Sequence, residues 1–375
     1  MTQTEAKVPA WLVYPEDEWV QITPAQAGFD EEKFGELAAG AQMKGAIFEG
    51  EVHGENEWGT VLTRGGYLVH AWGDPHYSFQ TASVAKAFSR ALVGLAAREG
   101  LLDPDEVISK TWTGEGELSH PHKYLDRGHH KTLTWRHLVG GKEDKFHAGG
   151  FPVTNGFFWR QGAYAHSATG WGRGYYTPRD SKTKRDRGSA IPDWAEWTGD
   201  PFYDNYAHAA PGTVEVYSSG GIWRLAQALT FLWGRDLKQV LDEQLFGEIG
   251  IRADRWDWIP GRSVYENKDF YASMPGYGDF VDPPYEIGGH PVRGGGGWAV
   301  MSASDLARFG LLVATDGVWK GKQLIDAEWV RSHGGGNGSF VIGDPDTYIS
   351  AGIVTTQGLP PIESFRELVT GPVAL

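Results

Sequence analysis

Ser83 and Lys86 are the residues whose types and spacing best predict chemistry in this chain. They stand three positions apart at the start of a segment with helical periodicity, and side chains three apart on a helix are neighbours. A serine hydroxyl attacks a carbonyl carbon only when a base takes its proton, and a desolvated, neutral lysine can be that base. The pair predicts a serine nucleophile activated by lysine. The alternative is a solvated Ser and Lys on a helix surface, because S-x-x-K is a common chance pattern.

The element that must position this pair is a helix, predicted to be capped by Thr81 and to stop at Gly100. One face of this helix is apolar, with residues recurring at i, i+4, i+7, i+8 and i+11: Val84, Phe88, Ala91, Leu92 and Leu95. The N-terminus of a helix offers unpaired N–H groups and a partial positive charge. A developing oxyanion can be held there.

A tyrosine and two glycine runs elsewhere in the chain can complete such a site. Tyr217 lies in a predicted turn, strand and helix start over 211–221. A phenol facing a Ser–Lys pair can shuttle protons, although a lone tyrosine is more often structural. The glycine runs at 294–297 and 334–336 allow a ligand to approach the backbone closely, so a backbone N–H there can complete an oxyanion hole.

The order of the predicted elements favours an α+β fold, in which an antiparallel sheet is built from both chain ends with flanking helices. Strands are predicted at 45–52, 58–63, 67–72, 339–344 and 348–356. Helices are predicted at 28–44, 221–232, 237–246 and 304–313. We expect a sheet domain from 1–100 and 290–375, and an inserted, mainly helical domain over 101–289.

The inserted domain contains an aromatic-rich loop region over 146–211, with little periodicity. Long irregular segments in compact domains are often lids or binding loops. Aromatic side chains there could stack on a substrate, or they could hold the loop in its own hydrophobic cluster. Both interpretations stay open at this point.

The order of these pieces resembles the serine β-lactamase and penicillin-binding-protein superfamily, in its class C and family VIII esterase branch. That group carries S-x-x-K, then a tyrosine motif, then K/H-T/S-G on a strand. Its three motif regions resemble 81–95, 211–221 and 333–356 here, and its G-G-G-then-helix segment resembles 294–313. The resemblance covers about 29–358 and implies a β-lactamase/transpeptidase-like fold.

Carried over to this chain, the resemblance implies that Ser83 is the nucleophile and Lys86 its partner base. Tyr217 would be the acid–base relay. The N–H groups of Ser83 and Gly336 would form the oxyanion hole, with Gly335 beside them in the substrate-binding group.

Three positions depart from the family pattern and bear on the substrate. His333 would replace the cation of the third motif, Gly334 stands where a Thr or Ser is usual, and Ser219 stands where Asn is usual. The changes at 333 and 334 weaken recognition of a substrate carboxylate, and the change at 219 weakens binding of a substrate carbonyl. Together they favour a neutral ester or amide. The third motif could instead lie at 294–297, because the segment 326–330 runs almost directly into His333 and leaves little room for the strand that relatives often have there.

The function expected from these residues is hydrolysis of a small ester, or of an amide, through an acyl-enzyme on Ser83 that needs no cofactor. The alternatives are a β-lactamase or D-amino-acid peptidase, and a sensor or binding protein that stops at the acyl-enzyme. An α/β-hydrolase is excluded because no G-x-S-x-G elbow is present.

Composition narrows the class of partner to small molecules. The chain has 375 residues and a net charge of −14, which argues against nucleic acid and anionic membranes. The absence of cysteine excludes disulfides and cysteine nucleophiles. Residues 1–19 show no export pattern and no apolar run approaches membrane-spanning length, so we expect a cytoplasmic protein. No metal is predicted, because one histidine cluster fits no metal-binding spacing: His120, His122, His129 and His130.

Overall fold

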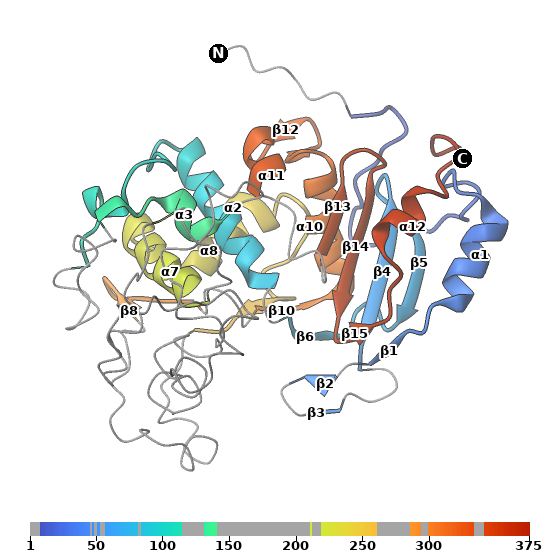
Figure 1. The fold of residues 1–375 in the computed structure, drawn as a ribbon, viewed down its shortest axis with the longest axis horizontal. Coiled ribbons are helices and arrows are strands. Elements are labelled where there is room, and N and C mark those ends of the chain that lie inside the picture. Colours follow the sequence, from blue (N-terminus) through green and yellow to red (C-terminus); the bar gives the residue numbers. More distant parts are fainter. Residues whose placement is uncertain are drawn as a thin grey trace, which may run out of the picture. The chain divides into compact units, whose positions relative to one another are not determined.

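The computed structural model describes residues 8–45, 47–48, 51–52, 57–81, 84–114, 131–140, 211, 219–260, 286–293, 299–333 and 341–375 (Figure 1). By compactness the chain divides into two units. The first comprises Met1–Ala87, Leu241–Asp257 and Ala299–Leu375, and the second comprises Phe88–Val240 and Trp258–Trp298. The domain boundaries expected from the sequence stay a prediction. The compact units differ from them in placing residues 241–257 with the two chain ends.

The first unit is built on a four-stranded antiparallel sheet whose strands come from both ends of the chain. Its order is β13 (Val341–Asp344), β14 (Ile349–Val354), β4 (Gly59–Arg64) and β5 (Tyr67–Gly73). The glycines of the tight β4–β5 turn, Gly65 and Gly66, have φ values of +56° and +86°, as such a hairpin requires. The sheet confirms the predicted α+β fold.

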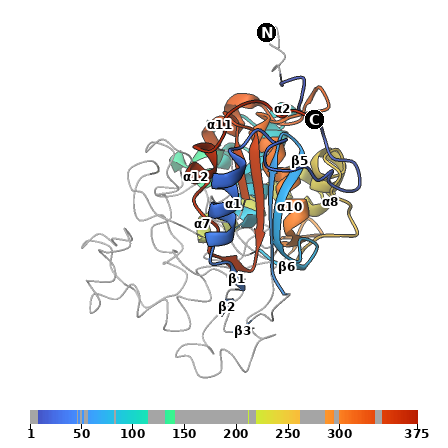
Figure 2. The same cartoon turned by 90° about the vertical axis from the view of Figure 1, so that its right-hand side faces the viewer.

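Helices cover both faces of this sheet (Figure 1). Helix α10 (Ala303–Ala314) packs on one face against β13, β14 and β4. Helices α1 (Glu31–Gly40) and α12 (Ile362–Arg366) lie on the other face, from which Figure 2 views the unit. The core on this second face is apolar: Ile22, Ala27, Phe29, Phe34, Leu62, Tyr67, Val69, Ile349, Ala351 and Phe365.

Three glycines allow α10 to lie close to the sheet. A Cβ at Gly352 would lie 2.0 Å from the Ala303 carbonyl oxygen, and one at Gly343 would lie 2.3 Å from the carbonyl oxygen of Gly310. Likewise, a Cβ at Gly310 would lie 2.4 Å from the carbonyl oxygen of Ile342. Any larger residue would force the helix away from the strands. This packing fixes the start of α10, and with it the strand that precedes it.

That preceding strand is β10 (Ala299–Ser302), which pairs antiparallel with β6 (Ser78–Gln80) just before the Ser83 segment. The other short strands of the first unit form hairpins or edge pairs: β1 (Lys44–Gly45) with β15 (Thr356–Gln357), β2 (Ile47–Phe48) with β3 (Glu51–Val52), and β11 (Val318–Trp319) with β12 (Lys322–Gln323). Helix α11 (Ala327–His333) and the π-helical turn η7 (Asp242–Phe246) complete this unit.

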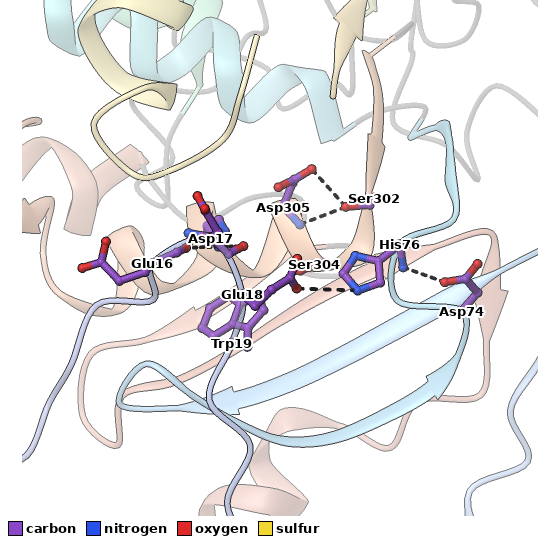
Figure 3. A network of polar contacts seen from close by, with 10 residues as sticks. Glu16, Asp17, Glu18, Trp19, Asp74, His76, Ser302, Ser304 and Asp305 are labelled. Carbon is purple, nitrogen blue, oxygen red and sulfur yellow. Dashed lines mark hydrogen bonds and ion pairs between the residues drawn. The ribbon is translucent and has the colours of Figure 1, made fainter. Parts of the chain in front are cut away.

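A buried arginine attaches the N-terminal segment to α10, and Figure 3 shows Asp17 and Trp19 of that segment near Ser304. Arg308 is 1% exposed and donates to the carbonyl oxygens of Asp17 at 2.8 Å and Ile249 at 3.3 Å. Trp19 lies over its guanidinium and donates its indole N–H to the Ser304 hydroxyl at 2.9 Å. A guanidinium can satisfy several carbonyls at once, so this one side chain ties two distant segments to α10.

Asp305 lies one helical turn before Arg308 and is 4% exposed. It takes part in the N-cap of α10 together with Ser302. Its backbone N–H donates to the Ser302 hydroxyl at 3.1 Å, and that hydroxyl donates to its carboxylate at 3.0 Å. Burial raises the pKa of Asp305 above the ordinary value of 3.8, although the Ser302 hydroxyl and the Arg308 charge oppose the rise.

We expect the free energy of unfolding of this unit to depend on pH because of that raised pKa. The folded state then holds the Asp305 proton more tightly than the unfolded chain, so the carboxyl lowers stability as pH rises through the window that begins near 3.8. In Asp305→Asn this loss should disappear, while an acceptor for the Ser302 hydroxyl remains. Urea unfolding from about pH 4 to about pH 7 should show the native chain losing stability relative to the variant. A difference that does not change with pH, or that changes with the opposite sign, would contradict this assignment.

The second unit is mainly helical where it is described. Helix α2 (Ala85–Arg98) leads into it from the first unit, followed by η2 (Ile108–Lys110), α3 (Trp135–Val139), α7 (Ser219–Trp233) and α8 (Leu237–Leu241). Helix α3 packs on α7, and Trp112 stacks on Phe231 with ring centroids 5.4 Å apart. Its strands are short: β8 (Glu286–Ile287) and β9 (His290–Pro291), while β7 (Asp257–Trp258) spans the boundary.

Several local predictions need correction. The single strand predicted at 45–52 is wrong, because β1 pairs with β15 from the far end of the chain while β2 and β3 pair with each other. The helix predicted at 237–246 changes at Asp242 into a π-helical turn, in which the Gly247 N–H donates to the Asp242 carbonyl at 3.0 Å. The helix predicted at 28–44 is shorter, because Ala41 is already extended. Among the described residues, no helix combines the length and apolar character needed to cross a membrane.

Candidate active site

The first candidate residue that the structure places is Lys86, the second residue of α2. It is 5% exposed, although a lysine ordinarily keeps its ammonium group in water. Burial disfavours the charged form of an amine and favours the neutral form, which can accept a proton. Ser83 precedes it by three positions and lies outside the described residues. The predicted stop at Gly100 is confirmed, because α2 ends at Arg98 and Gly100 has a φ of +72°.

The cap of α2 predicted at Thr81 stays a prediction, because Ala82 and Ser83 lie outside the described residues. The Thr81 hydroxyl donates to the carbonyl oxygen of Ala299 on β10 at 3.0 Å, and its backbone N–H donates to the same oxygen at 2.7 Å. The Thr81 carbonyl accepts from the Val84 N–H at 3.2 Å, and Val84 begins the helical turn that leads into α2. The side chain and N–H of Thr81 thus bind the sheet, while its carbonyl oxygen binds the helical turn that leads into α2.

In the second unit, a buried ion pair lies directly before the glycine run at 294–297. Arg293 makes a two-point contact with the Asp236 carboxylate, with its Nε donating to Oδ1 at 2.7 Å. Its Nη1 donates to the Trp258 carbonyl oxygen at 2.6 Å, and Trp258 contacts Phe88 of α2 edge to face at 6.3 Å. Both charged side chains are 12% exposed, so the pair holds residue 293 firmly. The glycine run itself lies outside the described residues.

His333 is the candidate for the third motif, which the resemblance places on a strand. In the structure His333 is instead the last residue of helix α11. The residue is 3% exposed, and its ring lies against that of Trp329 with centroids 4.1 Å apart. The next described strand, β13, begins only at Val341. The role of His333 as a cation near the substrate stays a prediction.

The remaining candidates are not placed relative to Lys86. Tyr217, Gly335 and Gly336 lie outside the described residues. Ser219 begins α7, but its side chain is outside the described part. The same holds for the histidine cluster over 120–130 and the aromatic-rich region over 146–210. In the stretches that the structure does describe, no three His, Asp or Glu side chains gather as a metal site would require.

Sequence reasoning missed two of the contacts around these segments. The Arg293–Asp236 pair had a local signal, because an arginine directly before a glycine run is a natural anchor for a flexible backbone. The Thr81–Ala299 contact had none, since the partners are separated by 218 positions and only the β6–β10 pairing brings them together.

Comparison with known proteins gives the family. The sequence model of the family described as "Beta-lactamase" matches residues 60–368. A search of the curated proteins found no match.

Among solved structures, a family VIII carboxylesterase is similar with a TM-score of 0.52 and 14% identity, over 94% of this chain and 98% of that one. A D-amino acid amidase from Ochrobactrum anthropi SV3 is similar with a TM-score of 0.47 and 16% identity, over 88% and 93% of the two chains. A penicillin-binding protein homolog from Caulobacter crescentus has a TM-score of 0.47 and 12% identity, over 88% and 98%. The family match spans most of the sequence, and the described sheet and helices fit the fold of the carboxylesterase. The chain belongs to the beta-lactamase family.

Proposed function

We propose that the protein is a serine hydrolase that cleaves a small neutral ester, or a related amide, through an acyl-enzyme on Ser83. The observation that carries the proposal is the burial of Lys86 at the start of α2, three positions after Ser83, in a member of the beta-lactamase family. Burial favours the neutral form of an amine, and a neutral lysine three positions after a serine in the sequence can serve as its general base.

The proposed reaction has two halves that balance in protons. In the first, the Lys86 amine takes the Ser83 proton as the oxygen bonds to the substrate carbonyl carbon, and the N–H groups of Ser83 and Gly336 hold the oxyanion. Tyr217 then passes a proton to the departing alkoxide, and the ester C–O bond breaks. In the second, a water gives its proton to the same relay and attacks the acyl carbonyl, and Ser83 regains its proton as the acid leaves.

The preference for a neutral substrate rests on the third motif. A carboxylate-bearing substrate such as a β-lactam needs a cation and a hydroxyl, and this chain has His333 and Gly334 at the matching positions. The placement of His333 at a buried helix end supports the same preference. The structural likeness to a carboxylesterase concerns the fold alone. A cytoplasmic location and a small-molecule substrate stay predictions.

The test compares a p-nitrophenyl ester of a short acid with a chromogenic cephalosporin on the native enzyme. We expect kcat/KM for the ester to exceed that for the cephalosporin by about tenfold or more. The cephalosporin carboxylate would lack one charged hydrogen bond, and such a bond contributes ~1.5–3 kcal/mol. A higher kcat/KM for the cephalosporin would replace the esterase with a β-lactamase. Stoichiometric acylation of Ser83 without turnover would replace it with a sensor.

A further inference from the structure

We infer that Thr81 is a positioning residue for the nucleophile, because it fixes the segment that carries Ser83 to strand β10. The inference rests on the proposed function, in which Ser83 is acylated. It concerns a side chain to which the resemblance assigns no role: Thr81 begins the region 81–95, two residues before the S-x-x-K motif itself.

Thr81 is attached to β10 by two donors on one acceptor. The backbone N–H continues the β6–β10 ladder, in which Gln80 opposes Val300 and Ser78 opposes Ser302, and it donates to the Ala299 oxygen at 2.7 Å. The hydroxyl adds a second donor to that oxygen at 3.0 Å. A carbonyl oxygen has two lone pairs and can accept both bonds. The second bond restrains the Thr81 side chain as well as its backbone.

The other end of Thr81 holds the residues that follow. Its carbonyl oxygen accepts from the Val84 N–H at 3.2 Å, and this bond spans Ala82 and Ser83 in the sequence. Val84 is fully buried, and Lys86 follows it into α2. Thr81 therefore binds the sheet through its two donors, and its carbonyl oxygen binds Val84, the first described residue after Ser83 in the sequence.

The acceptor on β10 lies on a well-supported part of the first unit. Ser302, at the end of β10, caps α10, and every residue of that helix is buried. The Ser304 N–H donates to the Pro75 carbonyl at 3.0 Å, which fixes the start of the β6 segment as well. Figure 3 shows this end, where Ser302, Ser304 and His76 lie together. The Ala299 oxygen is thus a fixed point from which Thr81 can set the position of the following turn.

The threonine hydroxyl is not required for strand pairing, and this makes the inference testable. Valine has the same shape as threonine, and in Thr81→Val the Ala299 oxygen still accepts the backbone N–H. We expect a melting temperature within about 3 °C of the native value. The rate at which a fluorophosphonate acylates Ser83 should nevertheless fall about tenfold, because small misplacements of a reacting group are costly. Ester kcat should fall with it, with KM nearly unchanged.

Thr81→Ser is the matched control, because it keeps the hydroxyl and loses only the methyl group. It should recover most of the acylation rate, which a role limited to packing would not predict. Acylation of Thr81→Val at the native rate would overturn the inference, and so would a Thr81→Ser enzyme as slow as the valine variant. Failure of the native chain to be acylated at Ser83 would instead overturn the proposed function itself, so the two failures are distinguishable.

Discussion

Ser83→Ala is expected to lower ester hydrolysis by about four to six orders of magnitude, because it removes the atom that forms the acyl bond. The change deletes one small hydroxyl, so the variant should unfold at the native urea concentration. Initial rates with a p-nitrophenyl ester at saturating concentration measure the effect.

Ser364→Ala on α12 makes the same chemical change away from the proposed site, and it should keep native activity. Retention of more than about a tenth of the native rate by Ser83→Ala would exclude Ser83 as the nucleophile, since residual catalysis without a nucleophile is far smaller.

Lys86→Met is the second substitution with a large expected effect. Methionine has a similar volume and an apolar, flexible side chain that packs well in a buried position. The fold should therefore tolerate the replacement of this 5% exposed side chain. Without a base, the Ser83 proton has no acceptor, and kcat should fall about 10²- to 10⁴-fold. Stopped-flow acylation by a fluorophosphonate should slow by a similar factor.

Lys86→Arg separates the loss of a base from the loss of a charge. An arginine keeps the positive charge but cannot be deprotonated in a protein. If Lys86 acts as a base, the arginine variant should be as inactive as the methionine variant. An active Lys86→Arg enzyme would show that the group at this position serves as a charge and that another residue takes the Ser83 proton.

The elements that were predicted well are those whose strand or helix character is contained in the local sequence. The strands predicted at 58–63 and 67–72 match β4 and β5 to within one residue, and the helix predicted at 304–313 matches α10. The errors lie where pairing with a strand distant in the sequence determines the local structure. Gly45 pairs with Thr356, more than three hundred positions away, so the residues after it do not continue as one strand. No local signal at 45–52 contains that choice.

The candidate site shows the same division. The helix that carries Lys86 could be predicted from its apolar face and its glycine stop, and the burial of Lys86 agrees with the proposed chemistry. The hydrogen bond from the Thr81 hydroxyl to Ala299 could not be predicted, because a threonine before a helix is normally expected to cap that helix. The position of His333 depended on where α11 ended, and helix ends are the least certain feature of any sequence pattern.

The most direct test of the central claim is to locate the covalent adduct after reaction with a fluorophosphonate. Trypsin cuts after Arg64 and Lys86, and the peptide between them contains only two serines, Ser78 and Ser83. Fragment-ion masses distinguish the two. The account predicts one adduct per chain, on Ser83, absent from Ser83→Ala and slower to form in Lys86→Met. An adduct on any other residue, or none in the native chain, would contradict it.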